Sequence, residues 1–283
     1  MGIKMDGKAL ADKICLDLKA QCDVLKSHNI NPVLTIVTSG EDSASKVYVR
    51  NKVKRCEEIG IKADVRHYDY LNYIELDNIL YSVGNPIIVQ EPIVGNVDHF
   101  DVSSRISSMM DVDGFTHINM GLLATGEKPY HHPCTPSGVM RLLEEYNIPL
   151  EGKNALIIGR SNIVGRPMAM MLEQAGCTVT VAHSKTTKDS LIENFVSADI
   201  VVSAVGKRNV VSDAEFLPSK RLKDKVLIDV GMNRDENGKL CGDFSEELKQ
   251  KAAYYTPTPG GTGPMTVAML MQNVIEYYER YYF

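Results

Sequence analysis

Residues 154–176, NALIIGRSNIVGRPMAMMLEQAG, decide the fold of this chain. An apolar run ends at Gly159, a short loop follows, and a helical pattern begins near Gly165 with Pro167 in its first turn. This order is typical of proteins that hold a dinucleotide, because N–H groups at a helix start attract phosphate. The usual G-x-G-x-x-G pattern is incomplete, since Ser161 replaces its middle glycine. A strand–helix turn without a ligand therefore remains an alternative at this point.

Apolar runs closed by turns continue from this segment to the last helix. We interpret them as consecutive strands of one parallel sheet, as in Rossmann-like domains. The runs are ALIIG (155–159), CTVTVAHS (177–184), ADIVVSAVG (198–206), KVLIDVG (225–231) and AAYYTPTPGG (252–261). Helical patterns between the earlier runs favour the α/β class.

The N-terminal part has its own alternation of helical and strand-like patterns. Helices are predicted over 6–26, 43–59 and 73–82, and strands over 32–40, 62–70 and 86–92. Ser43 is the candidate N-cap of the second helix and Gly60 its stop. The pattern changes after DVDGF (111–115), so we predict a catalytic α/β domain over 1–119 and a nucleotide-binding domain over 120–263. The last helix, 264–283, is expected to pack back on the first domain.

Composition excludes several classes of function. The chain has 283 residues, 44% hydrophobic, with a net charge of -5, which is typical of a globular protein and disfavours nucleic-acid or anionic-membrane partners. No apolar stretch approaches the ~20 residues of a membrane span, and the N-terminus has no secretory pattern. The six cysteines are scattered without C-x-x-C pairs, which indicates reduced thiols and a cytoplasmic location.

The second strand of the nucleotide-binding domain indicates which dinucleotide binds. NAD-binding domains usually carry an acid about 20 residues after the glycine loop, where it bonds the ribose 2′-hydroxyl. Here that strand ends in His183, Ser184 and Lys185. A hydroxyl and a cation there, together with Arg160 in the loop, suit a 2′-phosphate. The sequence therefore predicts NADP rather than NAD.

Polar residues of the first domain are candidates for chemistry. Tyr48 and Lys52 are four residues apart and share a helix face, although a solvated basic face is the ordinary alternative for such a run. Gln90 ends an apolar strand, where α/β sites are built, but edge-of-sheet polarity explains it equally well. Asp111 and Asp113 suit a turn, and no further cluster supports a metal ion there.

Read together, these motifs resemble one family. YVRNK, VQEP, DVDGF, PCTPSG, GRSNIVGRPM, LIDVGMN and TPTPGGTGPMTVAML follow one another over nearly the whole chain. In this order they resemble the bifunctional methylenetetrahydrofolate dehydrogenase/cyclohydrolase family. The resemblance implies a two-domain homodimeric enzyme with its site in the cleft between the domains. It also implies NADP-dependent oxidation of 5,10-methylenetetrahydrofolate to the methenyl form, and hydrolysis of that form to 10-formyltetrahydrofolate.

The resemblance implies a role for each matching residue. Lys52 would be the central catalytic group, Tyr48 would stack along the folate, Gln90 would bond the lysine, and Asp113 would grip the pterin. The proline–glycine loop would border the substrate and the nicotinamide through Pro259, Gly260 and Gly261. The implied cofactor-binding residues are Gly159, Arg160, Ser161, Ile163, Gly165, His183, Ser184, Lys185, Gly206, Gly231 and Thr266.

The match departs from the family after Gln90. Glu91 stands where the family usually has leucine. Its carboxylate either faces solvent or lies near Lys52, where it would weaken hydrolysis. A dehydrogenase with an impaired cyclohydrolase step is therefore one alternative. A non-catalytic NADP-binding sensor is another, although Tyr48, Lys52, Gln90 and Asp113 are all retained; a shikimate-type dehydrogenase is disfavoured by PGGTGPMT and YVRNK.

Overall fold

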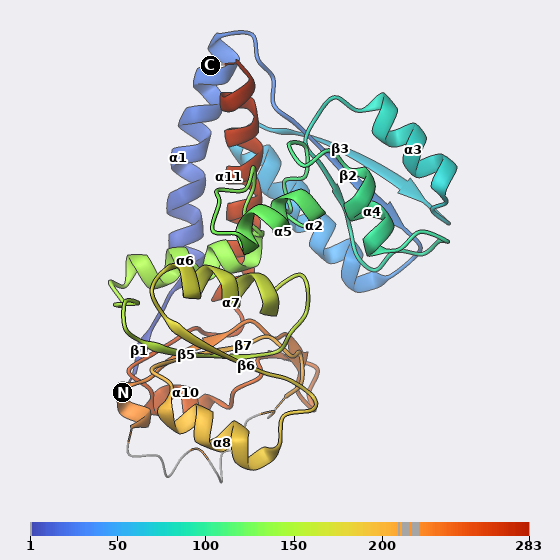
Figure 1. Ribbon diagram of the computed structural model, residues 1–283. Coiled ribbons are helices and arrows are strands. Elements are labelled where there is room, and N and C mark those ends of the chain that lie inside the picture. The colour runs from blue at the N-terminus through green and yellow to red at the C-terminus, as the bar shows by residue number, and fades with distance from the viewer. Residues whose placement is uncertain (1, 209, 211–215, 217–220, 283) are drawn as a thin grey trace. The chain divides into compact units, whose positions relative to one another are not determined.

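The computed structural model describes residues 2–208, 210, 216 and 221–282, which form two compact units (Figure 1). We call Met1–Ala11 with Thr135–Thr266 the six-stranded unit, and Asp12–Cys134 with Val267–Phe283 the three-stranded unit. Each unit combines helices with a parallel sheet, so the predicted α/β fold with a Rossmann-like parallel sheet is confirmed.

The six-stranded unit contains the predicted nucleotide-binding sheet. Its described strands are all parallel and lie in the order β1-β11-β8-β7-β5-β6. Because β6 and β7 lie on opposite sides of β5, the order of the strands reverses there, as in doubly wound nucleotide-binding folds. The elements are β1 (Ile3–Lys4), α6 (Cys134–Glu145), β5 (Asn154–Ile158), α7 (Gly165–Gln174), β6 (Thr178–Ala182), α8 (Lys188–Ser197), β7 (Ile200–Ser203), η1 (Leu222–Asp224), β8 (Val226–Asp229), β9 (Asn233–Arg234), β10 (Leu240–Cys241), α10 (Glu246–Lys251) and β11 (Tyr254–Tyr255).

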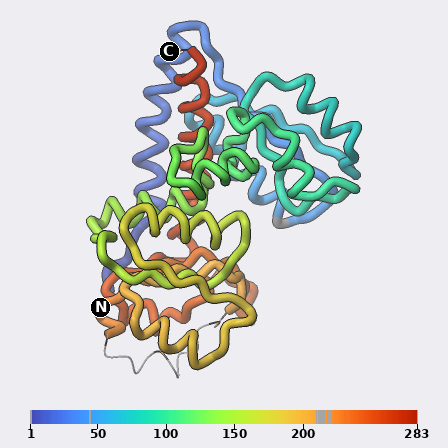
Figure 2. The backbone as a smooth tube through the Cα atoms, viewed as in Figure 1, coloured from blue at the N-terminus to red at the C-terminus, as the bar shows by residue number. Residues whose placement is uncertain are grey.

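Helices cover both faces of this sheet. Figure 1 shows α6 and α7 on one face and α8 and α10 on the other. On the second face, Phe195 of α8 and Leu248 of α10 pack with Leu156, Val201 and Leu227 from the strands. The strand β1, near the N-terminus, pairs with β11 near the other end of the chain. The N-terminal segment therefore completes one edge of this sheet (Figure 2). Burial on both faces explains why the central strands β5, β7 and β8 are largely apolar runs, whereas β6 at the edge is mostly exposed.

The three-stranded unit has a smaller parallel sheet in the order β3-β2-β4. A core that includes Val37, Leu76, Ile79, Ile87 and Val102 lies between this sheet and the helices α3 and α4. Its elements are α1 (Gly7–Ser27), which begins in the six-stranded unit, β2 (Val33–Ser39), α2 (Ser43–Ile59), β3 (Lys62–Tyr68), α3 (Tyr73–Ser82), β4 (Ile87–Val89), α4 (His99–Arg105), α5 (His117–Ala124) and most of α11 (Thr262–Tyr282).

The helix α2 differs from its prediction at one end. Its N-cap is Asp42, whose carboxylate accepts a hydrogen bond from the backbone N–H of Ser45 at 2.6 Å, so the prediction of Ser43 as N-cap is wrong. A carboxylate one residue earlier reaches the free N–H groups and also suits the positive end of the helix dipole. The stop at Gly60 is confirmed, because its φ of 98° lies in the left-handed region that favours glycine.

The three-stranded unit extends to Cys134, whereas the sequence prediction placed the domain boundary near residue 120. Asn119 of α5 explains why the following residues stay with the three-stranded unit. Its amide donates to Ser108 O at 2.9 Å and Asp111 Oδ2 at 3.1 Å, and its oxygen accepts from Tyr130 N at 3.0 Å. These bonds bind 119–130 to the loop that carries Asp111. The division of folate and NADP roles between 1–119 and 120–263 stays a prediction.

Among the described residues, no helix is both long and apolar enough to cross a membrane.

His131 lies buried in the loop before α6, and its burial makes the unfolding free energy of the protein depend on pH. Its Nε2 is 2.9 Å from Met109 O, while Nδ1 has no hydrogen-bond partner in the described structure. Burial lowers the pKa of His131 to about 4, since a charged ring would be poorly solvated there. The folded protein therefore keeps this ring neutral at pH values where an unfolded chain takes up a proton.

We expect acid to destabilise the protein through His131. Between pH 6.5 and 4 the unfolded chain binds more protons at this residue, so its contribution to the unfolding free energy falls as pH falls. Between pH 7.5 and 5 the wild type should lose about 2 kcal/mol more than His131→Gln, whose amide retains a donor. Urea unfolding at both pH values measures the difference. His117→Gln, which replaces an exposed ring, is the control; equal losses in all three proteins would contradict the prediction.

Candidate functional site

Lys52 and Gln90 meet in the three-stranded unit. Lys52 lies on the middle of α2, half-buried, one turn after Tyr48, and Gln90 directly follows β4. The Lys52 ammonium donates a hydrogen bond to Gln90 Oε1 at 2.9 Å. The Gln90 amide donates to Glu91 O at 2.8 Å, which leaves its oxygen for the lysine. The predicted pair of Lys52 and Gln90 therefore exists, and it holds a cation at the end of a sheet strand.

The remaining faces of α2 show why Tyr48 and Lys52 are available. Val49, Cys56 and Ile59 are buried, whereas Tyr48 is 38% exposed. The apolar stripe thus fixes α2 to its unit, and the Tyr48–Lys52 face points away from that core. Partial burial raises the pKa of the Tyr48 phenol, so it remains a neutral, flat surface.

Glu91 pairs with His99 in this structure. Its Oε1 lies 3.4 Å from His99 Nδ1, and the His99 ring meets Phe115 edge-on at 5.7 Å between centroids. The hydrogen bond to the Glu91 carboxylate raises the pKa of His99, against the effect of burial. The carboxylate that departs from the family thus has the His99 imidazole as its own partner, which weakens the case for an inhibitory contact with Lys52.

The DVDGF segment lines a cavity beside this pair. The cavity holds about 30 Å³, enough for about one water, and Asp113, His99 and Phe115 are among the residues that line it. Behind it, the buried Asp111 carboxylate accepts hydrogen bonds from Gly114 N at 2.9 Å and Thr116 N at 2.6 Å. Asp111 therefore shapes the turn, and Asp113 presents its half-buried carboxylate to the cavity.

Cys134 lies buried beside the DVDGF turn, and its Sγ donates to Val112 O at 3.3 Å. Burial raises the pKa of this thiol far above its ordinary value; the Asp113 carboxylate raises it further, while the Lys52 ammonium lowers it. The Asn273 amide fastens this region from α11 by donating to Val112 O at 2.8 Å and His132 O at 3.1 Å.

The glycine loop of the six-stranded unit is built by close backbone contact. Gly159 has a φ of 123°, which favours glycine. A Cβ on Gly165 would lie 2.3 Å from Gly159 O, so the helix α7 starts directly against the end of β5. The Ser161 hydroxyl accepts hydrogen bonds from Val164 N at 3.2 Å and Gly165 N at 3.3 Å. Ser161 therefore caps the start of α7, which is a structural role beside the predicted cofactor contact.

The end of β6 brings the predicted 2′-phosphate residues beside this loop. Ile158 pairs with Ala182, and Gly159 N donates to Ala182 O at 2.9 Å, so the residues after both strands are neighbours. The backbone N–H of Lys185 donates to His183 Nδ1 at 3.1 Å, which fixes the turn. The side chains of Arg160, Ser184 and Lys185 are exposed. Two cations and a hydroxyl at this edge fit a phosphorylated ribose, and the glycine loop fits a pyrophosphate.

The other predicted residues lie on loops at strand ends, except Thr266, which lies in the first turns of α11. Gly206 follows β7 with a φ of 65°, and Gly260 follows β11 with a φ of 97°. The Thr266 hydroxyl lies 3.0 Å from that of Thr135, and the exposed side chain of Ile163 lies in the glycine loop. Pro259 and Gly261 lie beside Gly260 in the loop between β11 and α11, and Gly231 lies in the loop that follows β8. The structure contains no bound molecule, so their contacts with cofactor or substrate stay predictions.

Sequence reasoning overlooked two groups that organise these sites. His99 follows no motif, and only its distance of 3.4 Å from Glu91 reveals it. Asp243 is completely buried and receives hydrogen bonds from Ser203 and Asn233, which lie far from it in the sequence. A signal for Asp243 was available in Gly231, since glycine beside a strand end marks a close approach and a Cβ there would meet the Asp243 carboxylate.

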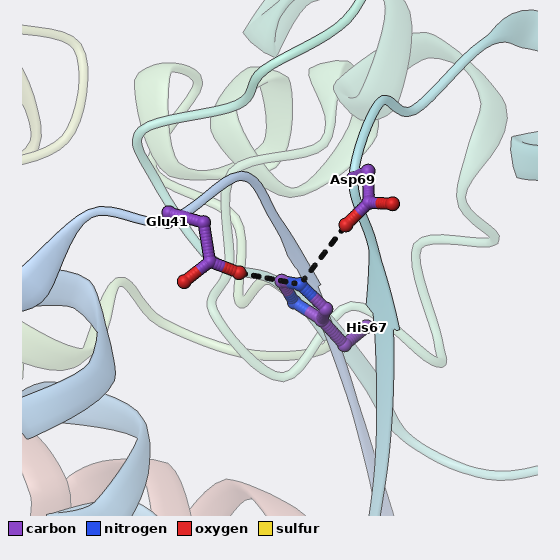
Figure 3. A group of neighbouring side chains, drawn as sticks. All are labelled: Glu41, His67 and Asp69. Carbon is purple, nitrogen blue, oxygen red and sulfur yellow. Dashed lines mark ion pairs between the residues drawn. The ribbon is translucent and has the colours of Figure 1, made fainter.

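One further cluster could resemble a metal site. Figure 3 shows Glu41, His67 and Asp69, with His67 Nε2 at 3.5 Å from Glu41 and 3.9 Å from Asp69. All three residues are exposed, and the Lys46 ammonium also pairs with Glu41. Because Glu41 already has a cation as partner and all three side chains are exposed, we interpret the cluster as a solvated ion-pair group.

Two family descriptions match the chain. The catalytic domain of tetrahydrofolate dehydrogenase/cyclohydrolase matches residues 5–113, and the NAD(P)-binding domain of the same family matches residues 133–282.

Individual relatives cover nearly the whole chain. The bifunctional protein FolD of a Polaromonas species is 44% identical over 98% of both chains. The crystal structure of the bifunctional enzyme FolD from Campylobacter jejuni has a TM-score of 0.93 and 41% identity, covering 99% of this chain and 100% of its own. The Trypanosoma brucei methylenetetrahydrofolate dehydrogenase-cyclohydrolase, solved with NADP and an inhibitor, has a TM-score of 0.89 and 30% identity, covering 99% and 98%.

Gly165→Ala should destabilise the six-stranded unit. The new methyl group would meet Gly159 O at 2.3 Å, and the strand end cannot retreat without losing its ladder bonds. We expect a loss of roughly 1–3 kcal/mol of unfolding free energy, measured by urea unfolding. Gly121→Ala is the matched control, since no atom lies within 4 Å of its Cβ position. Equal stability of the two variants would contradict the close contact.

Proposed function

Because this chain belongs to the tetrahydrofolate dehydrogenase/cyclohydrolase family, we propose that Lys52 and its neighbours carry both of its reactions. The enzyme oxidises 5,10-methylenetetrahydrofolate to 5,10-methenyltetrahydrofolate with NADP, and hydrolyses the product to 10-formyltetrahydrofolate. The hydrogen bond of 2.9 Å between Lys52 and Gln90 is the observation that supports the assignment of residues.

The oxidation depends on alignment. NADP, when bound, accepts the hydride that leaves the methylene carbon, and the folate becomes a cation. In our proposal Tyr48 offers its half-exposed ring to the folate, and Asp113 accepts hydrogen bonds from the amino-pyrimidine edge of the pterin. These contacts would hold the reacting carbon in one place, which is the main requirement of a hydride transfer.

The hydrolysis needs proton transfers. Water adds to the cationic carbon and loses one proton, which leaves a hydroxyl on that carbon. The hydroxyl then loses its proton as the C=O bond forms, the C–N5 bond breaks with its electron pair going to N5, and N5 gains a proton. Lys52 is the group that we assign to these transfers, because its Nζ is the half-buried ionisable group on this face of α2. Gln90 is a positioning residue, since it holds that Nζ through its amide oxygen.

For the cofactor, we propose that Arg160, Ser184 and Lys185 receive the 2′-phosphate. The supporting geometry is the pairing of Ile158 with Ala182, which brings the residues after β5 and β6 together. The pyrophosphate would lie at the loop between β5 and α7, where Gly159 and Gly165 let a ligand approach the backbone closely.

We further propose that the protein is a cytoplasmic homodimer. The strand β3 lies at the edge of its sheet, with Val65 44% exposed, and such an edge can be covered by a second copy. All six cysteines are free thiols, in keeping with a reducing compartment.

Lys52→Met should abolish hydrolysis. We expect methenyltetrahydrofolate hydrolysis to fall by roughly 10²–10⁴-fold, the usual contribution of a general acid–base group. Loss of the methenyl chromophore in a spectrophotometer measures the rate. Lys54→Met is the matched control, because Lys54 is an exposed lysine on the same helix. Hydrolysis by Lys52→Met within threefold of the control would refute the assignment.

Arg160→Ala and Lys185→Ala should weaken NADP selectively. Each loses a charge-assisted hydrogen bond to the 2′-phosphate, so KM for NADP should rise roughly tenfold while KM for NAD stays nearly constant. The initial rate of cofactor reduction with 5,10-methylenetetrahydrofolate gives both values. Lys223→Ala changes another exposed lysine of this unit and serves as control. A parallel rise for NADP and NAD would contradict a role in 2′-phosphate recognition.

A further inference from the structure

Asp243 is a buried carboxylate that joins separate parts of the six-stranded unit. It follows β10 and has no exposed surface. Oδ2 accepts hydrogen bonds from Ser203 Oγ at 2.7 Å and Val205 N at 3.0 Å. Oδ1 accepts from Lys207 N at 3.0 Å and Asn233 Nδ2 at 2.9 Å. Four donors thus converge on one side chain that no motif of the sequence singled out.

These donors belong to two loops at one edge of the sheet. Ser203 is the last residue of β7, and 204–207 follow it; Asn233 comes just after 230–232, the loop that follows β8. β7 and β8 are neighbours, with Ser203 paired to Asp229, so both loops leave the sheet at its carboxyl edge. Asp243 therefore links two loops that share no direct chain connection.

The Asp243 carboxylate also fixes the position of the loop after β8. A Cβ on Gly231 would lie 2.0 Å from Asp243 Oδ1, so the backbone of this loop rests directly on the carboxylate. In the loop after β7, the anchored N–H groups of Val205 and Lys207 flank Gly206, whose φ is 65°. Both Gly206 and Gly231 are predicted cofactor-binding residues, and Asp243 holds the backbone around each.

The buried pair of Asp229 and Lys249 fixes the position of Asp243. Its backbone N–H donates to Asp229 Oδ1 at 2.9 Å, and Asp229 Oδ2 pairs with Lys249 Nζ of α10 at 2.9 Å. The side chains of Asp229 and Lys249 are 0% and 1% exposed, so this pair is shielded from water. A shielded pair at the root of the loop keeps the Asp243 carboxylate in one position.

The strand order indicates which part of the cofactor these loops meet. The loop after β5 suits the pyrophosphate and the end of β6 suits the phosphorylated adenosine ribose. β7 and β8 lie on the opposite side of β5. In a doubly wound sheet the dinucleotide crosses the point where strand order reverses, so its remaining half, the nicotinamide ribose and ring, lies at the ends of β7 and β8.

We propose that Asp243 is a positioning residue for hydride transfer, which sets the two loops that receive the nicotinamide half of NADP. This inference rests on the proposed placement of NADP on the six-stranded unit. Asp243 is buried beneath the loops and acts through Val205, Lys207 and Gly231. Oxidation depends on the orientation of the nicotinamide, whereas hydrolysis of the methenyl form consumes no cofactor. Loss of Asp243 should therefore separate the two activities.

The test uses Asp243→Asn in the full-length enzyme. Asparagine keeps one acceptor oxygen but turns an NH₂ group toward two of the donors, which displaces at least one loop. We expect KM for NADP to rise roughly tenfold and kcat of oxidation to fall, while methenyltetrahydrofolate hydrolysis stays within about twofold of wild type. Asp235→Asn is the control: the half-buried Asp235 accepts backbone N–H bonds from Asn237 at 2.9 Å and Lys239 at 2.8 Å in the neighbouring hairpin turn.

Two milder variants protect the test against a failure to fold. Ser203→Ala and Asn233→Ala each remove one donor, and each should give the same separation of activities with a smaller rise in KM. An equal loss of oxidation and hydrolysis, or an unchanged KM for NADP in variants that fold, would overturn the proposal, because a merely structural role predicts those results. If the wild type hydrolysed the methenyl form but did not reduce NADP, the proposed NADP placement would fail instead.

Discussion

Parallel strand pairing is the constraint on which both candidate sites depend. Parallel strands end at the same edge of a sheet, so residues that follow different strands become neighbours. In the six-stranded unit the pairing of Ile158 with Ala182 brings the glycine loop beside the end of β6. In the three-stranded unit Gln90 N donates to Val37 O at 2.8 Å, which ends β4 beside β2 and directs the Gln90 amide toward Lys52. Both candidate sites therefore lie at the carboxyl edges of their sheets.

Each unit supports its site with a buried aspartate beneath the functional loop. Asp111 receives N–H groups from the turn that presents Asp113, and Asp243 receives them from the loops beside β7 and β8. Burying a carboxylate is costly unless donors satisfy it, and that cost penalises any other loop conformation. The two aspartates therefore act as templates: they give rigid shape to loops that contain glycine and would otherwise have many conformations.

The departure at Glu91 illustrates compensation within the tertiary structure. A carboxylate in this position could have reduced the function of Lys52, but it lies 3.4 Å from His99. The Glu91 carboxylate raises the pKa of the His99 imidazole, so the substitution adds a local pair beside the cavity that His99 lines. His99 belongs to no recognisable motif, and its spacing of eight positions from Glu91 has no helical or strand-like meaning. Such a pair becomes visible only when the loop and α4 are placed.

The sequence by itself determined the α/β class, the strand–loop–helix with Gly159 and Gly165, and the helix that carries Tyr48 and Lys52 on one face, because these depend on local periodicity and backbone geometry. Helix starts were less well determined: Asp42, not Ser43, caps α2. The tertiary structure alone decided that Lys52 meets Gln90 and that four distant donors converge on Asp243. The physical reason is that a buried polar side chain is satisfied by whichever donor folding brings near, and no local pattern encodes that partner.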